Sequence, residues 1–483
     1  MARLVKRRIE NSTAAILAAG ACYILAGWAL GFRPFDDTFI TFRYARNIAS
    51  GAGFVFNAGE RVLGTTSPAW ALFLAAASRL GAPIAGTAVA VSLAADVLTA
   101  WLIARLLRRF GASALVAGAG GIIFLSTFDA LSLGRSGMET SVFTAAVFGA
   151  MAAAAYSRTA LAGALAGLAA LIRPEGLAVV PIVMAAAARP RDALIAAAAA
   201  AAVVLPWWDF ATWYFGSPIP QSVMAKAAVS RAPQLAAFNW ANVRLFLVAG
   251  QYGGDIFKRS YWSLAALRTL LVLVGTVAAI RTGRRAALLL AAFPIGVFAA
   301  LAIANAFTWF PWYYAVFHAG FALLAAFGLQ RALASKPSGA RLVLAVSAIL
   351  VIAQIGVALR LKLPADRNDV VRGYFEAAAA IDPSGQPRVA ALEIGVVGWS
   401  APQATIIDLE GLVTPSAVGR RQADIVRETL PDYLMWRTNN AAGLIEGLSR
   451  DGWLSAHYDR IFAMDYANPS ERYETYRRRT FAP

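Results

Sequence analysis

Cysteine, histidine and charged side chains are all scarce in this chain of 483 residues. A single cysteine, Cys22, excludes an internal disulfide and any cysteine-based metal site. The two histidines, His318 and His457, lie far apart in different kinds of segment, and we interpret His318 as a packed or interfacial residue. Charged residues make up 15% of the chain and hydrophobic residues 59%. The chain is thus too apolar for an ordinary soluble enzyme, and it is predicted to be a polytopic membrane protein.

Acidic residues are the scarcer charged class, with 27 Asp and Glu against 44 Lys and Arg and a net charge of +17. Such a surplus of positive charge can indicate a nucleic-acid partner. Here, however, Lys and Arg cluster in short loops between apolar segments, as the positive-inside rule requires, and no basic patch with interleaved aromatics is present. Nucleic-acid binding is therefore disfavoured.

Hydrophobic runs predict about eleven membrane spans. The first follows the basic sequence MARLVKRRIE and has no clear cleavage site close behind it, so it reads as an uncleaved helix with a cytoplasmic N-terminus. The alanine run at 196–202 indicates close helix packing. The predicted membrane domain covers 1–361, with external loops at 33–82 and 214–260. Its spans are expected at about 12–32, 83–107, 112–128, 140–155, 161–172, 177–188, 193–213, 261–280, 286–307, 312–333 and 341–361.

From about Lys362 the composition becomes that of a soluble domain. Short buried strands are expected at 389–393 and 405–409, and a final strand pair near 460–465 and 473–479. Helices are expected around 369–381, 421–428 and 441–450. Residues 362–483 are therefore predicted to form a small α/β domain outside the cytoplasm.

Asp36 and Asp37 lie in the one long polar interruption near the start of the chain, residues 33–68. In the amphipathic stretch that they begin, Asp36 and Arg43 share one helical face about 10 Å apart. This spacing would let a carboxylate act at one end of a substrate while a guanidinium holds a phosphate at the other. Alternatively, Asp36 caps a surface helix and Asp37 favours its positive N-terminus.

The sequence RPEG separates two short apolar halves and is predicted to carry Arg173 and Glu175 outward on a tight turn. Charged residues there are expensive unless they face a wet cavity or a partner. The alternative is an ordinary turn with a self-satisfied Arg–Glu pair.

An acidic pair outside a first transmembrane helix, followed by many further spans, resembles the GT-C glycosyltransferases, which use lipid-linked sugars. More narrowly, the blocks DDTFITFRYARNIASGAGFVFNAGERVLGTTSP, GMET, RPEG, PIPQSVMAK and EIGVVGWS…IIDLEGLV look like the bacterial subgroup that contains the terminal β-(1→2) arabinofuranosyltransferases. The resemblance implies transfer of a sugar from a polyprenyl monophosphate to an external glycan or lipid acceptor, at the bacterial inner membrane.

Under this resemblance, Asp36 or Asp37 is the general base for an inverting displacement, and the sequence does not choose between them. Arg43, Arg173 and Lys226 are candidates to hold the donor phosphate. The further acids outside, which could bind sugar hydroxyls or serve as structural acceptors, are Glu60, Glu139 and Glu175.

No cofactor is expected: two adjacent Asp could hold a divalent cation, but a monophosphate donor makes a metal less necessary. In the distal domain Glu393, Asp408 and Trp399 could line a glycan-binding face, although strand-end acids beside glycine turns are common without function. The rival class is a transporter or flippase. Against it, the charged blocks gather at the outer ends of spans.

Overall fold

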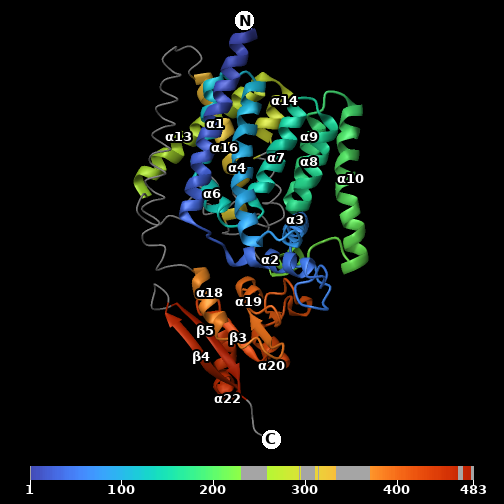
Figure 1. The fold of residues 1–483 in the computed structure, drawn as a ribbon, viewed down its shortest axis with the longest axis vertical. Coiled ribbons are helices and arrows are strands. Elements are labelled where there is room, and N and C mark those ends of the chain that lie inside the picture. Colours follow the sequence, from blue (N-terminus) through green and yellow to red (C-terminus); the bar gives the residue numbers. More distant parts are fainter. Residues whose placement is uncertain are drawn as a thin grey trace. The chain divides into compact units, whose positions relative to one another are not determined.

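A computed structural model of the chain describes residues 2–229, 258–292, 294, 311–313, 315–332, 370–465 and 471–479. The chain divides into two compact units (Figure 1). Unit 1 comprises Met1–Arg33, Ala88–Trp207 and Ala232–Lys362; unit 2 comprises Pro34–Thr87, Trp208–Arg231 and Leu363–Pro483. The second unit thus unites the C-terminal domain with most of the first predicted external loop and the start of the second.

Unit 1 is a bundle of helices, and most of the long helices α4 and α10 belong to it (Figure 1). In the described part of the chain, three helices are long and apolar enough to cross a bilayer, namely Thr13–Leu30 within α1, α4 and α10. The predicted span at 341–361, and most of that at 286–307, lie outside the described residues. The elements are α1 Ala2–Leu30, α4 Ile84–Arg109, α5 Ala114–Leu125, α6 Phe128–Gly134, α7 Thr140–Ala155, α8 Thr159–Ile172, η1 Pro174–Ala178, α9 Val179–Ala185, α10 Pro190–Phe215, α13 Lys258–Thr282, α14 Arg284–Ala287, η4 Leu288–Ala292, η5 Pro311–Tyr313 and α16 Ala315–Ala332.

Glycines bring the helices of unit 1 into backbone contact. A Cβ on Gly163 would lie 2.0 Å from the Ala196 carbonyl oxygen, and one on Gly167 would lie 2.7 Å from that of Ala200. The two glycines are four residues apart and lie on one face of α8, where a larger residue would collide with the backbone of α10. α8 therefore packs directly on the alanine run of α10, and the two helices lie beside each other in Figure 1. The predicted close packing of that run is confirmed.

Unit 2 contains a five-stranded sheet of order β2-β1-β3-β5-β4. β1 pairs in parallel with both β2 and β3, and β5 pairs antiparallel with β3 and β4. The predicted small α/β domain is confirmed, with one strand, β3, and two short α-helices, α19 and α22, that the sequence analysis did not expect. The elements are α2 Asp36–Ala49, α3 Pro68–Arg79, α11 Gln221–Val229, α18 Val370–Ala379, β1 Arg388–Ala391, α19 Gly395–Ser400, β2 Thr405–Asp408, η6 Pro415–Ala417, α20 Gln422–Thr429, β3 Tyr433–Arg437, α21 Ala442–Ser449, η7 Arg450–Gly452, α22 Trp453–His457, β4 Tyr458–Asp465 and β5 Arg472–Arg478.

The core of the C-terminal sheet is apolar on both faces of its central strands. β1 is buried at Val389, Ala390 and Ala391, and β3 is buried from Tyr433 to Trp436. Parallel strands covered on both sides read as continuous hydrophobic runs. β3 is such a run, but only five residues long, so its sequence alone does not distinguish it from a turn of helix.

Candidate active site

The acidic pair opens α2, and the first of the two aspartates is held by the C-terminal domain. The backbone N–H of Phe35 donates to Thr38 Oγ1 at 3.1 Å at the start of this helix. Asp36 instead turns to α19: its Oδ2 accepts from Gly395 N and its Oδ1 from Val396 N, each at 2.8 Å. Both carboxylate oxygens of Asp36 are therefore engaged with the backbone of α19, and the residue does not cap its own helix.

The glycine at 395 makes this contact sterically feasible. A Cβ there would lie 1.8 Å from the backbone carbonyl oxygen of Asp36, a distance at which no side chain fits. Gly398, one turn further along, lies against Phe56 and the guanidinium of Arg43 in the same way. The block EIGVVGWS is thus a glycine-faced helix shaped to pack on α2.

Arg43 lies under this contact and is almost fully buried, with 1% of its surface exposed. Its guanidinium donates to the backbone carbonyl oxygens of Phe56, Gly398 and Ala404, each at 2.7 Å. Burial lowers the pKa of this guanidinium to about 9. These hydrogen bonds connect the segment 34–87 to the C-terminal domain, so Arg43 lies in the contact between them and not at an exposed phosphate site.

Asn57 extends the same joint along the edge of the sheet. Its side-chain amide donates to the carbonyl oxygen of Ile406 at 2.9 Å, and its Oδ1 accepts from Ile406 N at 3.0 Å. The amide thereby mimics a neighbouring strand on the open edge of β2. Glu60 accepts from Asn57 Nδ2 at 3.0 Å, which gives this exposed acid a structural partner.

Two acids of the C-terminal domain join the aspartate pair. Burial raises the pKa of Glu393 to about 8, helped by the charges of Asp36 and Asp37 and opposed by Arg437. Burial likewise raises the pKa of Glu410, where Lys226 opposes the shift and Asp37 adds to it. Burial raises the pKa of Asp36 to about 7. The hydrogen bond from the backbone N–H of Val396 opposes this rise, and the charge of Asp37 adds to it.

Lys226 reaches this neighbourhood on α11. The first residue of that helix, Gln221, donates its backbone N–H to Leu63 O at 2.7 Å and its side-chain amide to Gly411 O at 3.2 Å. The exposed Lys226 follows between one and two turns later. Unit 2 therefore contains five of the predicted site residues: Asp36, Asp37, Arg43, Glu60 and Lys226.

Arg173 lies in unit 1 with two of the other predicted acids. Its Nη1 lies 2.6 Å from Glu139 Oε1 and its Nε 2.5 Å from Glu175 Oε1, and all three side chains are at most 12% exposed. Gly176 lets the RPEG turn fold onto the backbone of Ala169, and Arg173 is buried there. The expectation that the turn carries Arg173 to the outer side of the membrane stays a prediction. The alternative of a self-satisfied Arg–Glu pair is confirmed.

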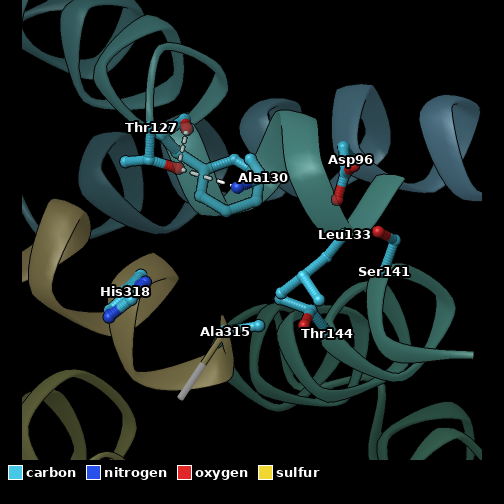
Figure 2. Close-up of a pocket in the computed structure, with 9 residues that line it drawn as sticks. Asp96, Thr127, Ala130, Leu133, Ser141, Thr144, Ala315 and His318 are labelled. Atoms are coloured by element: carbon cyan, nitrogen blue, oxygen red, sulfur yellow. Dashed lines mark hydrogen bonds between the residues drawn. The ribbon is translucent and has the colours of Figure 1, made fainter. Parts of the chain in front are cut away.

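A small cavity occurs elsewhere in unit 1. Figure 2 shows Asp96, Thr127, Ser141 and His318 around it, from segments that include α4, α7 and α16. Its volume of about 10 Å³ corresponds to roughly one water molecule. This cavity is too small for a sugar or a lipid phosphate, and Asp96 in its wall already accepts from Tyr23 Oη at 2.6 Å.

Within the described ranges, no three carboxylate, imidazole or thiol groups lie so as to hold a metal ion. Independence from metal accordingly stays a prediction.

Sequence reasoning missed Glu410 and interpreted Glu393 as structural. Both residues lie in blocks that carried the resemblance, but the signal that assigns them to the site is three-dimensional. β1 and β2 are parallel neighbours, so their carboxyl ends, each followed by one of these acids, meet at one edge of the sheet.

The fold is that of known membrane glycosyltransferases. The chain superimposes on ArnT from Cupriavidus metallidurans bound to undecaprenyl phosphate with a TM-score of 0.56 and 12% identity, over 95% of this chain and 97% of that one. The arabinofuranosyltransferase AftD from mycobacteria gives a TM-score of 0.52 and 14% identity, over 96% of this chain and 41% of that one. The expected GT-C fold is confirmed, and the chain is a multi-pass membrane protein.

In sequence, the chain is similar to a terminal β-(1→2)-arabinofuranosyltransferase of Mycobacterium tuberculosis, with 31% identity over 239 residues. The match spans 44% of this chain and 38% of the length of that relative. No family model matches the chain.

Proposed function

We propose that the chain is a glycosyltransferase that moves a sugar from a polyprenyl phosphate to a hydroxyl of an extracytoplasmic glycan or lipid, with inversion at the anomeric carbon. The similarity to an arabinofuranosyltransferase favours a pentofuranosyl donor. The fold shared with a protein that binds undecaprenyl phosphate supports the lipid carrier. In the proposed orientation the N-terminus is cytoplasmic and unit 2 lies outside, at the bacterial inner membrane.

The observation that carries the proposal is the pair of backbone hydrogen bonds that holds Asp36, which assigns different roles to the two aspartates. Asp36 is held through both oxygens by α19, which suits it to fixing the first turn of α2 and with it the position of its neighbour. Asp37 is then the general base: it takes the proton of the acceptor hydroxyl as that oxygen attacks the anomeric carbon. The bond to the phosphate oxygen breaks, and the polyprenyl phosphate leaves with both electrons.

Lys226 is the proposed cation for the leaving phosphate. The charge of Lys226 lowers the pKa of Glu410 and that of Asp37 raises it. A positive charge therefore lies near the same acid as the proposed base. Arg43 and Arg173 are not included, because backbone carbonyls and two glutamates respectively occupy their donors. Glu139 and Glu175 neutralise Arg173 in unit 1, and Glu60 supports Asn57, so we assign none of the three to the sugar.

Single-turnover transfer in nanodiscs tests this assignment, with a panel of polyprenyl-phosphate pentoses and hexoses as donors. Asp37→Asn keeps the shape of the side chain and removes the proton acceptor, so transfer should fall by roughly 10²–10⁴ while donor binding is unchanged. In Asp36→Asn, transfer should fall less than in Asp37→Asn. This variant should also loosen the C-terminal domain, since the amide nitrogen that replaces one carboxylate oxygen cannot accept the second N–H. Near-normal transfer by Asp37→Asn would remove the proposed base.

A further inference from the structure

Resting on the proposed function, we propose that Glu393 of the C-terminal domain binds the acceptor, by a hydrogen bond to a hydroxyl next to the one that attacks. The C-terminal domain is then a wall of the active centre and not an accessory glycan-binding module.

The first support is the position of Glu393 in the sheet. It follows β1, the central strand of the parallel set β2-β1-β3, and stands two residues before the N–H group that holds Asp36. Ligands of open α/β sheets bind outside the carboxyl ends of the parallel strands. Arg437 ends β3 and Glu410 follows β2, so the polar side chains of three strand ends gather at this edge.

The second support is the order of charges along that edge. The charges of Arg437, the aspartate pair and Glu410 act on Glu393, and those of Lys226 and Asp37 act on Glu410. An in-line displacement places the attacking hydroxyl opposite the departing phosphate. With the phosphate at Lys226 and the base at Asp37, the acceptor comes to the side where Glu393 lies.

The third support is the pairing of Glu393 itself. Its Oε1 accepts from Asn440 Nδ2 at 2.7 Å, which orients the carboxyl group. Nearby, the guanidinium of Arg437 donates to Asn440 Oδ1 at 3.2 Å, and its buried Nε has no acceptor within the described residues. Burial and the charges of Asp36, Asp37 and Glu410, against that of Arg437, keep the carboxyl mostly protonated at neutral pH, where it can both donate and accept.

The test compares Glu393→Ala, Glu393→Gln and Asn440→Ala in the nanodisc transfer assay, with a short synthetic arabinofuranoside as acceptor. Glu393→Ala should raise KM for the acceptor at least tenfold and leave donor binding unchanged, which also shows that the variant is folded. Glu393→Gln should stay within about threefold, because an amide keeps one donor and one acceptor. Asn440→Ala removes the orienting bond to Glu393, together with the bond from Arg437, but leaves the carboxyl group in place, so it should have a smaller effect than Glu393→Ala.

An unchanged acceptor KM in Glu393→Ala would overturn the inference, as would equal effects of Asn440→Ala and Glu393→Ala, which indicate a loop-holding role. A loss in Glu393→Gln as large as that in Glu393→Ala would also overturn it. Failure of the proposed function looks different: the unaltered chain would then transfer no sugar from any donor of the panel.

Discussion

Arg43 offers the sharpest stability prediction, because its role as a structural joint and its role as a phosphate ligand give opposite results. Replacing it with Met removes three hydrogen bonds to buried backbone carbonyls. Phe56 O keeps Asn47 Nδ2 as a donor and Gly398 O keeps Arg46 Nη2, whereas Ala404 O is left without a donor among the described residues. The orphaned carbonyl costs about 1–3 kcal/mol and each of the two other lost hydrogen bonds to the charged group costs about 1.5–3 kcal/mol, roughly 4–9 kcal/mol in total. Removing a buried charge recovers several kcal/mol of desolvation. We therefore expect unit 2 to lose about 2–4 kcal/mol.

A loss of this size lowers Tm by roughly 5–15 °C for a unit of 150–250 residues. The assay is thermal unfolding in nanodiscs, together with amide hydrogen exchange of residues 395–406, which should accelerate as α19 separates from α2. The matched control is Arg46→Met on the same helix. Arg46 is only half-buried and donates to Trp399 O at 2.9 Å and Gly398 O at 3.2 Å, so about 1 kcal/mol is expected.

The reasoning about Arg43 is refuted by a variant that keeps the Tm and the exchange rates of the unaltered chain but binds the polyprenyl-phosphate donor more weakly. That result would indicate that Arg43 binds the donor phosphate.

Three further predictions concern the same unit. Gly395→Ala should loosen α19 from α2 and reduce transfer, as seen in exchange and single-turnover rates, whereas Gly443→Ala, in open space, should do neither. Since folding raises the pKa of Glu393 from 4.5 to about 8, folded chains bind more protons in that range, and the free energy of unfolding should decline as pH rises through it. In Glu393→Gln the free energy of unfolding should decline less over this pH range. An equal decline in the variant and the unaltered chain would contradict the raised pKa of Glu393. Treatment with EDTA should leave transfer unchanged; a loss restored by Mg²⁺ or Mn²⁺ would show that a metal takes part.

The sequence predicted the elements of the fold where its patterns are long or repeated. The three long apolar helices within α1, α4 and α10, the helix that begins at Asp36, and four of the five C-terminal strands all have a clear periodicity or boundary. The count of about eleven spans stays a prediction. It also singled out Asp36, Asp37 and Lys226, which the structure gathers in unit 2.

What the sequence could not give is the partner of each charged side chain. In the sequence, Arg43 looks like a phosphate ligand, and only the fold shows that carbonyls more than 350 positions away accept its hydrogen bonds. Glu393 looks like an ordinary strand-end acid until the parallel pairing of β1 and the Asp36–Gly395 contact place it beside the acidic pair. Long-range contacts of this kind leave no local pattern to read.

The central claim, sugar transfer, is tested most directly by incubating the purified chain in sealed proteoliposomes with a polyprenyl phosphate that carries a labelled pentofuranose and an arabinofuranoside acceptor. Mass spectrometry and NMR of the product should show one new glycosidic bond with the anomeric configuration inverted, and released polyprenyl phosphate in equal amount. Movement of the intact labelled lipid across the bilayer without a new glycosidic bond would instead identify a transporter and contradict the account.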